Sequence, residues 1–514
     1  MANYVSGNRD GSEQFMPLGK WKPDVAVPMN DGIPFLLNAF PRPDGFYGPE
    51  RDLQPQSSQS TTPFTDSNAI KVHGSLHSIP VPGSNPRYYV GTLATADGDS
   101  RIIARDELGA WSDLSKSGGY NSTPSTPWRF ANFGNKILAV QLGTTLQISD
   151  GGSGLFRDVN ARIRGSDVAT VRGFAVLIDI NDVDFGEGVQ PYRVWWSAIG
   201  DAENWPDPIS DTALNVQSGF RDLFGGGRLR RIIPGIGNAD AIVIAERKMW
   251  RMRFVGPPAT FDFDEIESDQ GTSMPGSVAA FNETFFYYGH NGFYWFDGSN
   301  SRPIGQGVVD QFFDADSSYS TAFGSQRAVE AAIDSEKKCY TVAYRSVAAT
   351  TDANDRILRY NWLTDTWSNA AIAADSIGHV DSQGSTTDSP RMVYIGQDFQ
   401  ISRSIGATLE TTIETRENVL ENATISQIKG VLPLADASDL VAKIKTRDYP
   451  YSTTFIETSE RGWQSDGWIR FFDETPTGRF YRCRMRIPAG STWSAIQGIY
   501  YQYAEHQRGP RRDT

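Results

Sequence analysis

The segment YRVWWSAIGDAENWPDP (residues 192–208) gathers three tryptophans and three acidic residues, a combination that could serve carbohydrate chemistry. Indole faces stack on sugar rings, and a glycosidase needs two carboxyl groups facing each other across a groove at roughly 5–10 Å. Asp201 and Glu203 are the candidates for such a pair. Both fall in a tight turn, however, where Asp201 is suited to cap the free amides that follow it. We therefore predict no catalytic residue here.

The same tryptophans have a structural interpretation. Trp195 and Trp196 lie on opposite faces of one expected strand, since side chains alternate along a strand. The turn at Gly200 and the prolines at 206 and 208 direct Trp205 back toward that strand. An aromatic plug that packs a strand is the interpretation we favour, and a sugar-binding platform is the alternative.

Metal and cofactor chemistry has weak candidates. DINDVDFGEG (179–188) resembles half of a calcium loop through Asp182, Asp184 and Gly186, but it lacks the glutamate at the twelfth position. An exposed acidic hairpin tip is the alternative. His73 and His77 are spaced i, i+4 in a strand-like context, where this spacing does not bring two ligands together, and we expect both at the surface.

Cysteine, the remaining residue type that commonly binds metals, occurs twice. Cys339 and Cys483 lie far apart, without CxxC spacing, so neither a disulfide framework nor a zinc site is expected. We predict no metal and no cofactor.

Two arginine-rich segments are candidates for contacts with partners. FGGGRLRR (224–231) joins a hinge of three glycines to three arginines; a solvated loop is the interpretation we favour, and a mobile loop that touches a partner or DNA is the alternative. The hinge glycines are Gly225, Gly226 and Gly227. In GRFYRCRMRI (478–487), Arg482, Arg484 and Arg486 share one strand face. They would pair with Glu410 and Glu414 across strands, dock another subunit, or do both.

Composition limits the partners. The chain has 514 residues, 61 acidic against 48 basic, and a net charge of −13. An acidic surface argues against binding nucleic acid through its phosphates, which requires clustered Lys and Arg. No stretch approaches the length of a transmembrane helix, and no secretory signal is recognisable, so we expect no membrane partner.

Short apolar runs separated by Gly, Asn and Asp recur along the middle of the chain, which is typical of an all-β protein. SVAAFNETFFYYGHNGFYWFDG (277–298) is the clearest unit, with three strands joined by Asn and Gly turns. Similar units begin near Ser75, Trp128, Asp167, Arg231, Ser277, Arg327 and Asp375. Their spacing of roughly 50 residues is that of propeller blades. We predict a β-propeller of about seven blades.

The flanks differ from this repeat. Residues 1–70 are rich in Pro, Gly, Gln and Ser and predict an extended arm with little regular structure. The propeller is expected over 71–408, and residues 409–507 alternate apolar and polar side chains as in an antiparallel β-sandwich. Residues 508–514 form a basic tail.

Three blocks resemble a known family. RVWWSAIGDAENW (193–205) is similar to the W-S-x-x-G-x-x-x-x-W signature of the tail nozzle, or packaged-DNA stabilisation, proteins of short-tailed bacteriophages. NAFPRPDGFYGPERDL (38–53) resembles their N-terminal segment, and the end of the chain (478–512) resembles their closing pattern of arginine-rich and Gly-aromatic strands. The signature residues are Trp195, Trp196, Ser197, Gly200 and Trp205.

This resemblance implies a virion structural protein, made in the host cytoplasm and located at the tail tip. It implies a ring of six copies below the head-to-tail adaptor, which closes the DNA channel, retains packaged DNA that passes without specific binding, and docks fibres or spikes. Such a channel would be gated by a loop, and the segment Gly225–Gly227 is the candidate. It implies no catalytic residue, so we expect a protein that is not an enzyme. The alternative is a carbohydrate-binding or carbohydrate-active propeller that acts as a phage receptor-binding protein.

Overall fold

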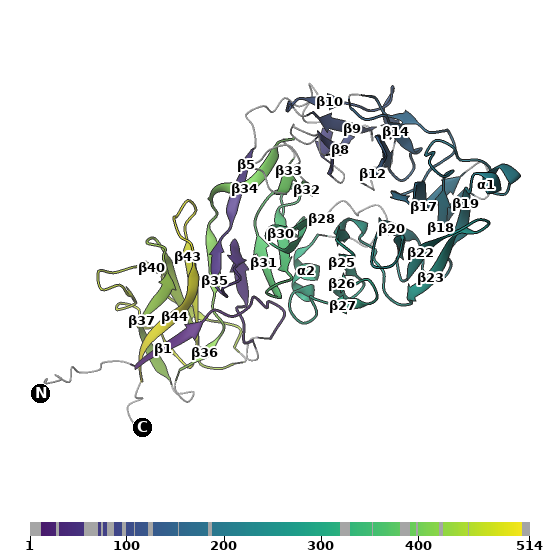
Figure 1. The fold of residues 1–514 in the computed structure, drawn as a ribbon. Helices are drawn as coiled ribbons and strands as arrows, with labels where there is room; N and C mark the ends of the chain where they lie inside the picture. The colour runs from purple at the N-terminus through teal and green to yellow at the C-terminus, as the bar shows by residue number, and fades with distance from the viewer. Residues whose placement is uncertain are drawn as a thin grey trace, which may run out of the picture.

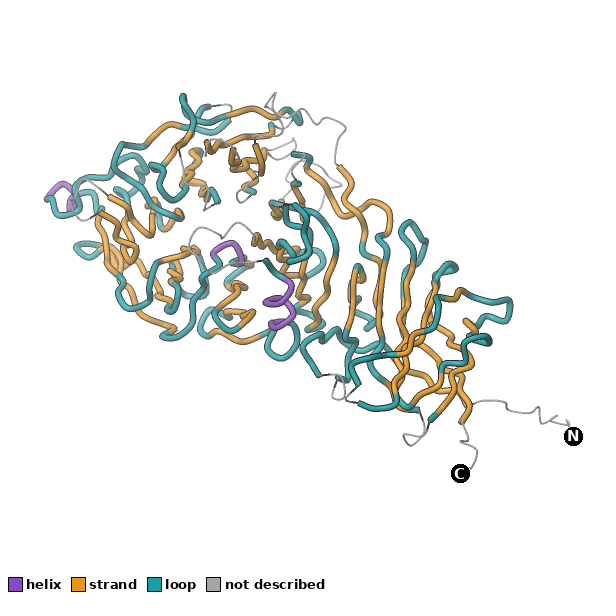
Figure 2. Tube along the Cα trace, turned by 180° about the vertical axis from the view of Figure 1, so that it is seen from behind, coloured by secondary structure: helices purple, strands orange, loops and turns teal. Residues whose placement is uncertain are grey.

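The computed structural model describes residues 12–26, 30–55, 70–72, 76–79, 87–94, 99–106, 108–121, 127–152, 154–182, 188–318, 329–351, 353–380, 391–396, 399–420, 425–450 and 452–505. In this part of the chain the fold is almost entirely antiparallel sheet, with two short α-helices, α1 (Asp211–Asn215) and α2 (Asp310–Asp316). Seven sheets surround an axis as the blades of a propeller, and two further sheets lie beside it (Figures 1 and 2). The predicted seven-bladed propeller is confirmed.

The first four blades follow one another along the chain. Blade 1 contains β6 (Ile70–Val72), β7 (His77–Ile79), β8 (Arg87–Ala94), β9 (Asp99–Arg105), β10 (Trp111–Asp113) and β11 (Tyr120–Asn121). Blade 2 contains β12 (Arg129–Phe133), β13 (Lys136–Val140), β14 (Gln147–Ser149) and β15 (Arg157–Asp158). Blade 3 contains β16 (Asp167–Val171), β17 (Phe174–Asp182), β18 (Gly188–Trp196) and β19 (Gly219–Asp222). Blade 4 contains β20 (Leu229–Pro234), β21 (Ala241–Ala245), β22 (Met249–Gly256) and β23 (Thr260–Glu267).

The last three blades complete the circle. Blade 5 contains β24 (Ala279–Phe281), β25 (Thr284–Gly289), β26 (Gly292–Phe296) and β27 (Ser301–Pro303). Blade 6 contains β28 (Val329–Asp334), β29 (Cys339–Tyr344), β30 (Arg356–Asn361) and β31 (Thr366–Ala370). Blade 7 contains β32 (Ser376–Val380), β33 (Arg391–Ile395) and β34 (Ile401–Thr408), and its outermost strand is β5 (Arg51–Pro55) from the N-terminal region.

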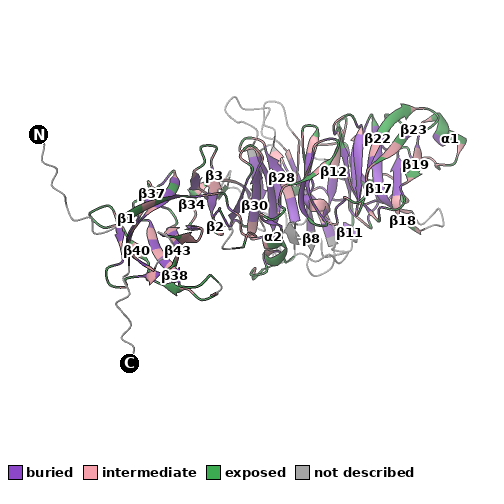
Figure 3. Cartoon of the chain, turned by 90° about the horizontal axis from the view of Figure 1, so that it is seen from below, coloured by how far each residue is buried: buried purple, intermediate pink, exposed green. Residues whose placement is uncertain are grey.

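Apolar side chains between neighbouring blades hold the propeller together. Separate hydrophobic clusters join blades 1 and 2, 2 and 3, 3 and 4, 4 and 5, 6 and 7, and 7 and 1. Trp128 illustrates how close this packing is: a side chain at Gly91 in blade 1 would meet its ring at 2.4 Å. Figure 3 shows the result, with strands largely buried and exposed residues gathered at outer elements such as α1 and β23.

The two remaining sheets belong to the C-terminal part and take strands from the N-terminal region. One contains β3 (Ala39–Pro41), β4 (Tyr47–Pro49), β44 (Ile496–Glu505), β37 (Ser426–Ala435) and β41 (Ile469–Arg470), with β1 (Ser12–Pro17) and β42 (Thr477–Gly478) at its side. The other contains β2 (Phe35–Leu37), β35 (Thr411–Glu414), β43 (Phe480–Ile487), β38 (Val441–Arg447) and β39 (Ile456–Glu457), with β36 (Asn418–Val419) and β40 (Arg461–Gly462). Both sheets contribute to one hydrophobic cluster, which extends into blades 5 and 6.

The N-terminal region has more regular structure than its composition suggests. Its described residues form five strands, which enter both C-terminal sheets and blade 7. Pro and Gly do not prevent this, because the strands are short and three of them, β2, β3 and β5, lie at the edges of their sheets. Among the described residues, no helix is long and apolar enough to cross a membrane.

Candidate functional site

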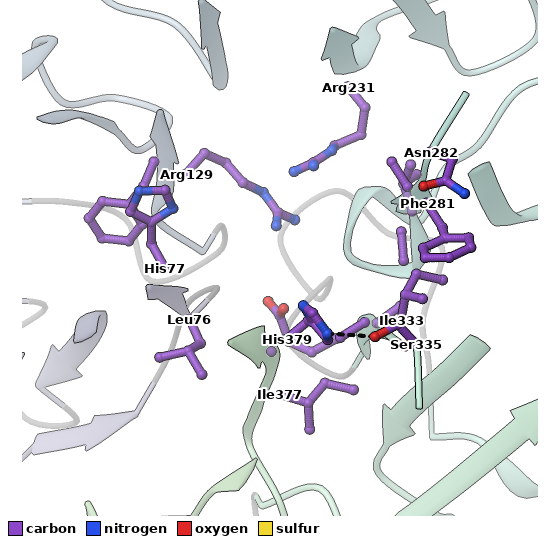
Figure 4. A pocket seen from close by; sticks show the side chains of 18 residues that line it. Leu76, His77, Arg129, Arg231, Phe281, Asn282, Ile333, Ser335, Ile377 and His379 are labelled. Atoms are coloured by element: carbon purple, nitrogen blue, oxygen red, sulfur yellow. Dashed lines mark hydrogen bonds between the residues drawn. The ribbon is translucent and has the colours of Figure 1, made fainter. Parts of the chain in front are cut away.

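A cavity of about 570 Å³ lies where the innermost strands of the blades converge on the axis of the propeller. We call it the axial cavity. Its polar lining comes from several blades and includes His77, Arg129, Arg231, Asn282, Glu330 and His379, and Figure 4 shows the side chains of Arg129 and Arg231 directed toward its middle. A volume in the range of roughly 300–1,000 Å³ is typical of small-molecule sites. The cavity is therefore the candidate site of this molecule.

Arg129 is the most unusual group in the axial cavity. It begins β12, its residue is 7% exposed, and its buried Nη2 has no hydrogen-bond partner within the described structure. Burial, together with the positive charge of Arg231, lowers the pKa of Arg129 to about 10. Arg231 itself lies with Nε 3.4 Å from the Oδ2 of Asp167. The guanidinium group of Arg231 is thus paired with a carboxylate, whereas the Nη2 of Arg129 has no such partner in the described part of the chain.

Glu330, on β28, supplies a carboxyl group to the same cavity. Glu330 is 6% exposed, and its carboxyl group forms neither a hydrogen bond nor an ion pair with the described residues. Burial raises its pKa to about 6, although Arg129 and Arg231 oppose the shift. The group therefore changes between a hydrogen-bond donor and an acceptor at mildly acidic pH.

Two histidines extend the polar lining. The Nε2 of His77 lies 2.8 Å from Oδ1 of Asn132, and its ring stacks on Phe130. The Nε2 of His379 lies 2.8 Å from Oγ of Ser335, the contact drawn in Figure 4. Burial lowers the pKa of His77. We expected His77 at the surface, but its position on the innermost strand of blade 1 turns it toward the axis, and His73 lies outside the described residues.

The proposed carboxylate pair at 201 and 203 does not form a catalytic groove. Oδ1 of Asp201 accepts a hydrogen bond from the amide of Glu203 at 3.0 Å, as expected for a cap. The carboxylate of Glu203 pairs with Lys136 and, at 3.1 Å, with Arg157 of blade 2. Both acids thus have structural partners.

The tryptophans nearby are buried as a plug. Trp195, Trp196 and Trp205 are 1%, 3% and 8% exposed, which leaves no face for a sugar ring. Trp205 meets Trp195 edge to face with centroids 5.7 Å apart. Ser197 accepts a hydrogen bond from the amide of Ala175, and Gly200 has a φ of +70°, a conformation that favours glycine.

The three-glycine loop is tightly packed. A Cβ at Gly226 would meet the ring of Trp250 at 2.5 Å, and one at Gly227 would meet the carboxylate of Glu246 at 2.4 Å. Gly225 and Gly227 have positive φ. The loop does not line the axial cavity, although Arg231 at its end does. Its role as a gate stays a prediction.

The arginine stripe pairs across strands. Arg482 contacts Glu414 at 3.1 Å, and Arg486 contacts Glu410 at 3.2 Å and Glu460 at 2.6 Å. Arg484 lies over the ring of Phe35 at 5.1 Å. The predicted pairing with Glu410 and Glu414 is therefore present, and a docking role stays a prediction.

The metal candidates find no support in the described part of the chain. Asp184, Gly186 and the side chain of Asp182 lie outside the described residues, and the described residues contain no group of three or more His, Cys, Asp or Glu placed to hold a metal ion. Cys339 and Cys483 are buried and free.

Sequence reasoning missed Arg129 and Glu330. Each is a charged residue within a largely apolar strand that begins a blade, in RFANF and VEAAID. That pattern is the signal that could have found them, because the first strand of every blade faces the axis.

Comparisons with known proteins add a distant likeness. No family model and no curated protein matches the chain. Similar solved structures include an exo-β-1,3-galactanase from Phanerochaete chrysosporium, solved with galactose (10% identity, 88% of this chain and 100% of that chain, TM-score 0.29). They include a glycoside hydrolase family 43 arabinoxylan arabinofuranohydrolase from Bacillus subtilis (11%, 86% and 98%, TM-score 0.24). They also include the β-propeller domain of the Trilobed protease from Pyrococcus furiosus (10%, 67% and 93%, TM-score 0.32).

One sequence-based expectation is corrected by these comparisons. We expected a protein that is not an enzyme, because the resemblance to nozzle proteins implies no catalytic residue. The similar structures include proteins that are named as enzymes, so we withdraw that expectation. Identities of 10% and 11% assign no activity to this chain.

Proposed function

We propose that the chain is a structural protein of a bacteriophage virion, a subunit of the ring that forms the distal nozzle of a short tail. The proposal rests on the three sequence blocks that resemble nozzle proteins and on the part that these blocks play in the fold. Residues 38–53 supply β3, β4 and the first part of β5, which connect a C-terminal sheet to blade 7. Residues 193–205 form the aromatic plug of blade 3. The described part of 478–512 supplies β43 and β44, which belong to different C-terminal sheets.

The observation that carries the proposal is that all three blocks lie where sheets or blades of the molecule pack together. Selection for a rigid subunit would maintain residues at such positions. Rigid subunits are suited to a ring that is closed by repeated heterologous contacts. The acidic balance of 61 against 48 is also suited to a conduit that DNA must pass without adhering.

The test is to find the protein in particles. Virions purified from the phage that encodes this chain should contain it, and electron microscopy with a specific antibody should label the tail tip. Particles assembled without it should lose their DNA. The purified protein, or the complex extracted from tails, should have the mass of six 56.8 kDa chains, about 340 kDa. Absence of the protein from virions would refute the proposal.

Carbohydrate binding in the axial cavity is the second candidate function. The observation that favours it is that Arg129 and Glu330 face one cavity, where the Nη2 of the first and the carboxyl group of the second have no hydrogen-bond partner among the described residues. Buried polar groups are normally satisfied, so a ligand that offers both acceptors and donors fits this lining. Sugar hydroxyl groups offer both, and the apolar side chains of Phe130 and Ile333 offer surfaces for ring carbons.

A glycan array, followed by calorimetry on any binder, tests this candidate. Arg129→Ala should abolish binding, whereas Arg253→Ala, which removes an exposed arginine from an outer strand of blade 4, should leave it unchanged. Incubation of the glycan with the protein and analysis of released sugar would separate binding from cleavage. Failure of every array glycan to bind would rule the candidate out.

A further inference from the structure

A second cavity, of about 290 Å³, opens between blades 5 and 6 and is lined mainly by aromatic rings. We call it the aromatic groove. Trp295 of β26 and Trp362, the residue after β30, are its half-buried indoles. Phe286 is 3% exposed and lies beneath them. The plane of each indole is within 24° of the Phe286 ring, with centroids 6.5 Å away for Trp295 and 5.7 Å for Trp362.

These indoles differ from the plug in blade 3. Trp195 and Trp205 are packed on every side, whereas Trp295 and Trp362 keep part of their surface open to the groove. The parts of these two indoles that face the groove favour a flat partner with apolar C–H groups on one face. The rim is polar: Asn282 and Thr284 belong to the turn and strand that border it. Flat apolar faces edged by hydroxyl groups are the chemistry of a pyranose ring.

The aromatic groove borders the axial cavity. Phe281 and Asn282 line both, since they end β24 and begin the turn to β25. Figure 4 shows these two side chains at the border of the axial cavity, on the side opposite His77. Asn282 is exposed, so its amide can reach a molecule on either side. The two cavities are therefore neighbours that share the wall formed by Phe281 and Asn282.

We propose that the aromatic groove and the axial cavity are two adjoining subsites for one oligosaccharide. One sugar ring stacks on Trp362 and Trp295, and a neighbouring ring lies among Arg129, Glu330 and the histidines. This inference rests on the second candidate function, carbohydrate binding, and adds the length and orientation of the ligand. It predicts that affinity grows with the number of linked sugars.

The experiment compares sugars of increasing length with variants of each subsite. Calorimetry is carried out on the full chain with one-, two- and four-unit members of the β-1,3-galacto-, cello- and malto-oligosaccharide series, together with any glycan-array binder. For a series that binds, the tetrasaccharide should bind more tightly than the monosaccharide. Trp362→Ala should weaken the tetrasaccharide by roughly tenfold and change the monosaccharide by less than about twofold, while Trp362→Phe should retain most of the gain with length.

Controls separate the possible failures. Trp468→Ala, at a half-buried tryptophan near β41, should change nothing, and thermal melting should show that each variant is folded. Arg129→Ala should abolish binding of sugars of every length. If oligosaccharides bind but Trp362→Ala leaves the gain with length intact, the two-subsite inference is overturned while carbohydrate binding stands. If no sugar binds the unaltered chain, both are overturned.

Discussion

Glu50 and Arg359 form an ion pair in which both side chains are almost completely buried, 2% and 1% exposed. Glu50 directly precedes β5, and Arg359 lies on β30 of blade 6. Ser404 of β34 donates to Glu50 at 2.9 Å, and Arg359 donates to the hydroxyl of Tyr394 at 3.1 Å. Burial alone would raise the pKa of Glu50, but Arg359, Lys337 and Ser404 reverse the shift and lower it. The pair thus ties the N-terminal region to the last two blades.

Glu50→Gln should lower the free energy of unfolding by about 3–5 kcal/mol, because it leaves the Arg359 guanidinium buried without a counter-charge. Glu50→Gln combined with Arg359→Met should recover part of this loss. Urea denaturation measures both. Asp264→Asn, which breaks an exposed pair with Arg253, is the control and should cost less than about 1 kcal/mol. A loss as small as this for Glu50→Gln would contradict the role assigned to the pair.

Glu330 should make stability depend on pH. Its pKa rises from 4.5 to about 6 on folding, so its contribution is fully present below pH 4.5 and is lost as the pH rises through 6. Between pH 4.5 and 7, the unaltered chain should lose about 2 kcal/mol of unfolding free energy relative to the Glu330→Gln variant. Melting curves across this range measure it. Glu283→Gln, at an exposed turn, serves as the control, and a constant difference for Glu330→Gln would refute the assignment.

Trp205→Ala should destabilise the propeller by about 3–5 kcal/mol, because it opens a cavity against Trp195. Trp205→Phe should cost less, since an aromatic ring is kept. Denaturant midpoints report the loss. Neither variant should alter glycan binding in calorimetry, and an effect on binding without one on stability would revive the sugar-platform interpretation.

Gly226→Ala tests whether the three-glycine loop is packed as described. The added methyl group would lie 2.5 Å from the ring of Trp250, so we expect a loss of about 1–3 kcal/mol in stability. Gly462→Ala is the matched control, because its nearest neighbour would be 3.9 Å away. Equal melting temperatures for the two variants would indicate a loop that moves aside freely.

The blades were predictable because their signals are local. Units expected to begin near Trp128, Asp167 and Ser277 correspond to strands that begin at 129, 167 and 279. Period-two alternation and Gly or Asn turns arise within about ten residues, so a sequence records them directly. The capping role of Asp201 was predictable for the same reason.

The candidate site was not predictable in this way. Arg129 and Glu330 are about 200 residues apart, and only closure of the circle brings them to one cavity. Likewise, nothing near Arg51–Pro55 shows that this segment pairs with Ile401–Thr408. Long-range pairing follows from tertiary packing, which single-sequence patterns do not encode.

The pairing of β5 with β34 delays closure of the propeller during synthesis. β5 is translated roughly 350 residues before β34, so at about 5–20 residues per second the ribosome needs tens of seconds to supply its partner. Until then β5 has no partner and the circle stays open. Late closure, followed by a closed form with a high barrier to opening, is the kinetic behaviour that this topology implies.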